Sequence, residues 1–129
     1  MTMELTMLFW AVILTFVQVV VAVLLAMAQV GVPEIAGNRE GLTTSAMAGR
    51  AKRAHINMLE NLPLFAILVL VVHMAGLSTE QTVLGAQIFV IARLVYALVY
   101  IIGVPWLRTG IWTVSVVGMA MIAWPILAA

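Results

Sequence analysis

The stretch LTMLFWAVILTFVQVVVAVLLAMA, from Leu5 to Ala28, decides the fold of this chain. It contains no charged residue, and only Thr6, Thr15 and Gln18 interrupt its apolar character. About 20 consecutive apolar residues are enough for a helix to cross the hydrocarbon core of a bilayer. The stretch therefore predicts a membrane-spanning helix. We expect this helix to be retained rather than removed as a signal peptide, because its apolar run is too long for one.

Three further apolar segments follow the first, separated by turns rich in glycine and proline. The expected helices cover about residues 5–30, 44–74, 79–102 and 107–127 of a single transmembrane domain, 1–129. Of the 129 residues, 65% are hydrophobic and 9% charged, whereas roughly a quarter are charged in soluble domains. Short connections make successive helices antiparallel neighbours. The sequence therefore predicts an all-α integral membrane protein, an up-down bundle of four transmembrane helices.

Charge and cysteine content exclude several functions. The net charge is +1, which does not indicate a nucleic-acid partner. The chain has no cysteine, so disulfides, thiolate metal sites and a cysteine nucleophile are excluded. We predict no metal site.

The basic residues predict the orientation in the membrane. Arg39, Arg50, Lys52 and Arg53 lie in the first loop or at the start of the second helix, and Arg108 lies in the third connection. The termini and the second connection have none. Because loops rich in Lys and Arg stay in the cytoplasm, we expect loops one and three inside and both termini outside. In a bacterium this would be the inner membrane.

Polar side chains gather on the second, third and fourth helices near that cytoplasmic end. Those on the second helix follow spacings of three and four, which place them in one stripe: Arg50, Arg53, Asn57 and Glu60. Those on the third helix also share a face: Arg93, Tyr96 and Tyr100. At 1.5 Å per residue, Glu60 and Arg93 lie at similar depth, so each is the expected partner of the other.

Two interpretations of this cluster remain open. One is a buried ion pair that fixes helix register, with the tyrosines as packing groups. The other is a ligand pocket, favoured because the cluster also holds several further cations, Arg108 of the fourth helix among them. A cationic pocket with one deep carboxylate suits a small, flexible ligand with terminal carboxylates and an amine.

His55 lies about 200° round the helix from Arg53, so it does not join the same pocket within one chain. It is either a satisfied polar residue near the loop or a group that completes the pocket of a neighbouring subunit.

These residues carry a family resemblance. The run RAHINMLENLPLF, from Arg53 to Phe65, resembles the second-helix signature of the MAPEG family, membrane-associated proteins of eicosanoid and glutathione metabolism. The run RLVYALVY, from Arg93 to Tyr100, resembles the third-helix pattern of that family, and Arg108 with its neighbour Thr109 resembles the start of its fourth helix.

The resemblance implies a homotrimer that uses glutathione as cosubstrate at sites between subunits, open to the cytoplasm. Glutathione would be held by residues of the second and third helices: Arg53, Asn57, Glu60, Tyr96 and Tyr100. Glu60 would receive the ammonium group and Arg53 a carboxylate. His55 would reach in from the neighbouring subunit, and Arg108 would be the catalytic cation beside the thiol.

The predicted function is that of a membrane-bound glutathione-dependent transferase or peroxidase, acting on lipophilic electrophiles from the bilayer. The alternative is a non-catalytic accessory subunit of a larger membrane complex. It is motivated by the segment 27–30, which lacks the arginine that glutathione-using members carry there. An ion or proton pathway through Glu60 and Arg93 ranks last, because the polar stripe occupies only one end of the bundle.

Overall fold

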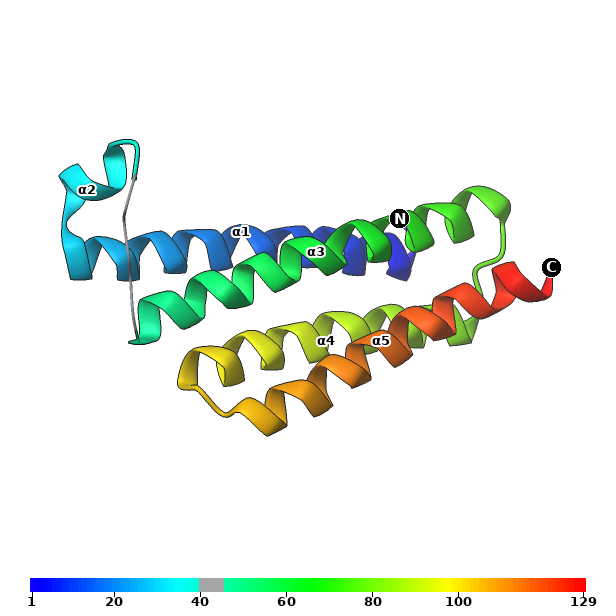
Figure 1. Ribbon diagram of the computed structural model, residues 1–129. Coiled ribbons are helices and arrows are strands. Elements are labelled where there is room, and N and C mark those ends of the chain that lie inside the picture. The colour runs from blue at the N-terminus through cyan, green and yellow to red at the C-terminus, as the bar shows by residue number, and fades with distance from the viewer. Residues whose placement is uncertain (40–45) are drawn as a thin grey trace.

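The computed structural model describes residues 1–39 and 46–129, and within these ranges it contains helices and no strand. Four helices are long: α1 (Met3–Val30), α3 (Ala46–Ala75), α4 (Glu80–Ile102) and α5 (Pro105–Ala128) (Figure 1). Each of the four has the length and apolar composition needed to cross a membrane. The all-α fold with four membrane-spanning helices agrees with the sequence analysis.

The first connection differs from the expected irregular loop. It contains a short helix, α2 (Val32–Ala36), with Pro33 in its first turn, a position where the missing amide hydrogen of proline costs nothing. Gly31 separates α2 from α1 with a φ of 90°, a conformation that favours glycine. The expected start of the second long helix, residue 44, lies outside the described residues.

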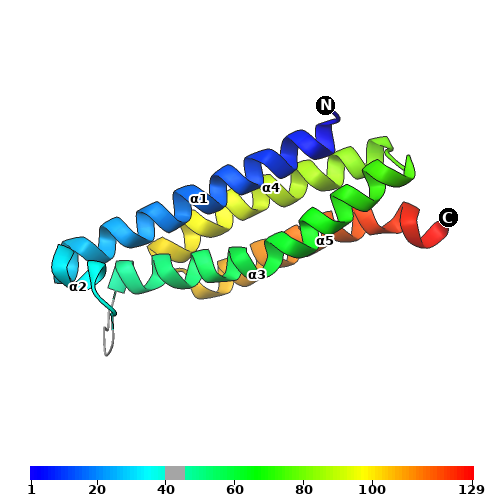
Figure 2. The ribbon, with the colours of Figure 1, turned by 90° about the horizontal axis from the view of Figure 1, so that it is seen from above.

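The long helices form two antiparallel pairs. Helix α1 packs against α3, α4 packs against α5, and the two pairs lie side by side, as Figures 1 and 2 show from two directions. Both termini and the α3–α4 connection lie at one end of the bundle (Figure 1). Helix α2 and the α4–α5 connection lie at the other, which is the end that carries the polar stripe.

The core lies where the two pairs meet. The rings of Phe65 and Phe89 stack there, with centroids 4.0 Å apart and planes 11° from parallel. Many other large apolar side chains, such as Phe16, Ile67 and Trp106, are exposed on the outside of the bundle. An apolar exterior of this extent suits a lipid surrounding rather than water.

Hydrogen bonds to Glu4 stabilise the end of the bundle that lies opposite the polar stripe. The Glu4 side chain is 1% exposed, and its Oε1 accepts hydrogen bonds from Ser78 Oγ at 2.5 Å and Thr82 Oγ1 at 2.6 Å. Thr79 caps α4 and forms a capping box with Thr82. These bonds hold the start of α1 against the start of α4.

Candidate functional site

Arg93 is the buried centre of the polar cluster between α3 and α4. Its side chain is 1% exposed, and its Nη2 donates a hydrogen bond to Asn57 Oδ1 at 2.7 Å. The same Asn57 oxygen accepts from Asn61 Nδ2 at 3.2 Å, and that amide also donates to the Asn57 carbonyl oxygen at 2.8 Å. A neutral amide, held by a second amide, is therefore the partner of this cation.

The expected pairing of Glu60 with Arg93 is wrong for the part of the chain that the structure describes. Arg93 Nε and Nη1 are buried there without a hydrogen-bond partner, while Glu60 is exposed. Three residues beyond Asn57, Glu60 is displaced by about 60° round α3 and by most of a turn along it. Asn57 therefore points at α4, whereas Glu60 lies on the edge of the interface.

Two arginines and two tyrosines form a ladder along α4 towards α5. The Arg93 guanidinium lies over the Tyr96 ring, with Cζ 4.2 Å from its centroid, and Arg108 lies over the Tyr100 ring at 4.4 Å. The two tyrosine rings meet edge to face, 5.6 Å apart. Each cation thus faces an aromatic ring, an arrangement that stabilises positive charge away from water.

A cavity of about 180 Å³ opens beside this ladder. It is lined by residues of three helices: Asn57, Tyr96, Arg108, Thr109 and Trp112. Asn57 and Tyr96 both contact Arg93, which therefore lies directly behind the wall of the cavity. Glu60 lies three residues beyond the cavity residue Asn57 on α3 and is exposed. The wall of the cavity thus carries a guanidinium, a phenol and an amide, and a second guanidinium, that of Arg93, contacts the Asn57 and Tyr96 of this wall.

Comparison with the sequence models of protein families identifies the family of this chain. The sequence model of the MAPEG family matches residues 7–128. The chain belongs to the MAPEG family. Comparison with curated proteins and with solved structures gives no match. Family membership agrees with a membrane protein of glutathione or eicosanoid metabolism, as the resemblance in the sequence implied.

In this MAPEG chain, the stripe predicted on α3 divides into two parts. Arg50 and Asn57 turn towards α4, where Arg50 Nε donates to the carbonyl oxygen of Ile101 at 2.8 Å. Arg50 thus bonds one of the last carbonyls of α4, where a cation is favourable. Arg53 and Glu60 are exposed on the neighbouring face of α3.

His55 lies apart from the other candidate residues of this MAPEG chain. It lines a different cavity, between α1 and α3, that does not include Asn57, Tyr96 or Arg108. This agrees with its angle on the helix, which excluded it from the pocket of its own chain.

Two residues of the site were not assigned from the sequence. Asn61 holds the Asn57 side chain, and its position four residues after Asn57 was the available signal, because residues so spaced share a helix face. Trp112 lines the cavity one turn after Arg108, but a tryptophan in an apolar helix is common enough that its spacing gave no signal.

Proposed function

We propose that this chain is a membrane-bound glutathione-dependent transferase or peroxidase that acts on lipophilic electrophiles. The observation that carries the proposal is the cavity beside Arg93, whose two buried donors have no partner among the described residues. A buried donor without a partner costs about 1–3 kcal/mol, and more when it is charged. An anionic ligand in the cavity would bring a charge of the opposite sign close to the Arg93 guanidinium, which lies behind the cavity wall.

The chemistry of glutathione fits the groups around the cavity. It has two carboxylates, one ammonium group and one thiol. Exposed Glu60, three residues beyond the cavity residue Asn57 on α3, suits the ammonium, whereas Arg53, four residues before Asn57, suits a carboxylate. Arg108 lies in the cavity wall, where a cation favours the thiolate form of a nearby thiol. The thiolate would attack the electrophilic atom of a substrate that arrives through the bilayer, displacing its leaving group.

We also propose that the protein is a homotrimer. Pockets for small-molecule ligands of drug size measure about 300–1,000 Å³. The cavity of one chain, about 180 Å³, is smaller, and Arg53 and Glu60 are exposed on the neighbouring face of α3. A neighbouring copy that covers this face would enlarge the pocket and shield both charges from lipid. The detergent-corrected mass in solution tests this proposal, and a monomer at micromolar concentration would disprove it.

Glutathione affinity tests the proposed site. Glu60→Gln keeps the shape of the side chain and removes its charge, so we expect glutathione to bind at least tenfold more weakly, the loss of about 1.4 kcal/mol of a charge-assisted hydrogen bond. Isothermal titration of the detergent-solubilised protein measures this. His73→Gln, an exposed substitution at the other end of α3, is the control and should bind like the wild type. Equal binding by the wild type and Glu60→Gln would reject the site.

A non-catalytic accessory subunit is the second candidate. The observation that favours it is the last turn of α1, which carries no basic residue. Turnover of glutathione with a chlorodinitrobenzene-type electrophile and with a lipid hydroperoxide separates the two candidates. Glutathione binding without a rate above the detergent blank for either compound would favour the accessory subunit.

The orientation in the membrane is a further part of the proposal. Five of the six basic residues lie in or next to the first and third connections, so we place these in the cytoplasm. Since the chain has no cysteine, single cysteines report on sidedness without background. In intact cells, Ser78→Cys in the α3–α4 connection should react with an impermeant maleimide, whereas Thr109→Cys should not. The reverse pattern would invert the topology.

A further inference from the structure

The charge of Arg93 fixes which way the side-chain amide of Asn57 faces. The two ends of an amide have nearly the same shape, and only their hydrogen bonds distinguish the oxygen from the nitrogen. A guanidinium donates hydrogen bonds and accepts none. Since Arg93 Nη2 lies 2.7 Å from the end of the Asn57 side chain, the amide atom at that place must be Oδ1. The nitrogen of the same amide therefore turns away from Arg93 Nη2.

Asn61 holds this amide from one turn further along α3. Its Nδ2 donates to Asn57 Oδ1 at 3.2 Å and to the main-chain carbonyl oxygen of Asn57 at 2.8 Å. Both partners are acceptors, so Asn61 must present its nitrogen to them. With the bond from Arg93, Asn57 Oδ1 receives two donors, which occupy the two lone pairs of an amide oxygen. The Asn61 side chain is 8% exposed, so it is itself confined by its surroundings.

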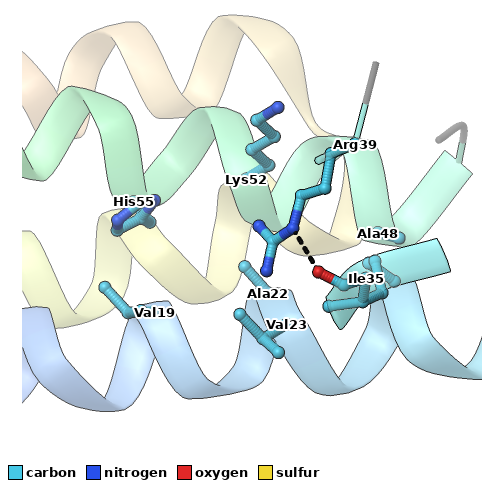
Figure 3. A pocket seen from close by; sticks show the side chains of 9 residues that line it. Val19, Ala22, Val23, Ile35, Arg39, Ala48, Lys52 and His55 are labelled. Carbon is cyan, nitrogen blue, oxygen red and sulfur yellow. Dashed lines mark hydrogen bonds between the residues drawn. The ribbon is translucent and has the colours of Figure 1, made fainter. Parts of the chain in front are cut away.

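The other polar side chains of α3 near Asn57 do not take part in this arrangement. Figure 3 shows His55, two residues before Asn57, beside α1 in the cavity between α1, α2 and α3. Glu60 is exposed on the neighbouring face of α3. Among the described residues, the donors to the Asn57 side-chain oxygen are therefore Arg93 and Asn61.

The Asn57 side-chain nitrogen is left for the cavity of about 180 Å³, which Asn57 lines. This Nδ2 makes no hydrogen bond to the described residues, and it is not buried. Because Oδ1 is already occupied, the Asn57 amide offers the cavity two N–H donors and no acceptor. Arg108, in the same wall, also carries donors only. A ligand atom that contacts both groups must be an acceptor, such as a carbonyl or carboxylate oxygen.

We propose that Asn61 is a positioning residue that keeps the Asn57 side-chain nitrogen turned towards the cavity, where it donates to a carbonyl or carboxylate oxygen of glutathione. The proposal rests on the proposed function, since it takes glutathione as the ligand. Asn61 is not among the described residues that line the cavity, so it acts through Asn57. Its two bonds restrict the rotation of a side chain that would otherwise be held by Arg93 alone.

Two substitutions of Asn61 separate positioning from packing. Asn61→Leu has a similar shape but no donor, so glutathione should bind about fivefold more weakly, which corresponds to one hydrogen bond of about 1 kcal/mol. Asn61→Gln keeps a donor that can reach back four residues on the helix, and it should bind more tightly than Asn61→Leu. A packing role predicts the reverse order, since leucine fits the space and glutamine is longer by one methylene. Isothermal titration of the detergent-solubilised variants measures both affinities.

Nuclear magnetic resonance of the asparagine side chains reports on the amide orientation. The chain has three asparagines, Asn38, Asn57 and Asn61, so labelling their side chains with ¹⁵N gives three amide signals. Asn38→Ala and Asn61→Leu each remove one signal, which assigns the third to Asn57. In the ligand-free wild type, the amide hydrogens of Asn57 should exchange with water faster than those of Asn61, whose nitrogen is bonded. Saturation with glutathione should shift the Asn57 signal but not that of exposed Asn38.

Loss of the positioning role and loss of the proposed function give different results. If the wild type binds glutathione without a shift of the Asn57 signal, or if folded Asn61→Leu binds glutathione as tightly as the wild type, the positioning role is overturned and the proposed function stands. If the wild type does not bind glutathione, the proposed function is rejected and the positioning role with it. The wild-type signals decide the question even where a variant does not fold.

Discussion

Replacing Gly118 by leucine should leave little folded protein, because the backbones of α4 and α5 touch at this residue. A Cβ atom on Gly118 would lie 2.7 Å from the Gly85 carbonyl oxygen and 3.0 Å from the Phe89 amide nitrogen. Both neighbours are backbone atoms, so no side-chain rotation relieves the clash. Helices in a membrane associate largely through close packing of this kind, since lipid offers no hydrophobic driving force between them.

The loss of stability should increase with the size of the side chain that replaces the hydrogen of Gly118. Gly118→Ala already forces the helices apart and should cost about 1–3 kcal/mol, the usual penalty of overpacking. Leucine should cost more, since the helices must then separate along the Phe89 layer of the core. Thermal unfolding in detergent, followed by tryptophan fluorescence and by the yield of monodisperse protein, measures both variants.

Gly110 is the matched control on the same helix. A Cβ atom there meets nothing within 4 Å. Gly110→Ala should therefore raise stability, by up to about 1 kcal/mol, because alanine favours a helix over glycine. If Gly118→Ala and Gly110→Ala unfold at the same temperature, the close approach of α4 and α5 is not what holds them together.

The helices could be predicted from the sequence because the bilayer imposes one strong requirement. Each span needs about 20 apolar residues, and stretches such as Leu5 to Ala28 meet it without ambiguity. The close approach at Gly85 and Gly118 could not be predicted, since other glycines of the chain, such as Gly110, show no comparable contact. The burial of Glu4 was also missed, because its partners are some 75 residues away, beyond any local pattern.

The candidate site was predictable in its location but not in its pairing. Helical spacing correctly grouped Asn57 with Arg50 on the face of α3 towards α4, and placed His55 elsewhere. The pairing of Arg93 failed because charge alone made Glu60 the obvious partner, whereas a shift of about 60° round the helix decides which side chain points across. Depth along the helix is read easily from a sequence, but the rotation of two packed helices is not.

Asn57→Ala should destabilise the protein more than Arg93→Met, although the arginine carries the charge. Removal of the amide leaves the buried Arg93 guanidinium without its hydrogen-bond acceptor, at a cost of about 1.5–3 kcal/mol. Removal of the guanidinium leaves no such deficit, because Asn57 Oδ1 still accepts from Asn61 Nδ2. It also relieves the cost of holding a cation away from water, so the net loss of stability should be small.

The stabilities of the two variants are compared by unfolding them in increasing concentrations of dodecyl sulfate. Asn38→Ala, at an exposed position, is the control for the asparagine change. In the double variant Asn57→Ala with Arg93→Met, the loss of stability caused by Asn57→Ala should largely disappear, since no cation remains to be satisfied.

The effect of Arg93→Met on glutathione affinity should be large although its effect on stability is small. Arg93→Met should lose at least about tenfold in affinity while staying folded, as its unpartnered donors lie behind the cavity wall. A variant that is stable and binds glutathione like the wild type would assign Arg93 to packing alone, because its buried charge would then serve no ligand.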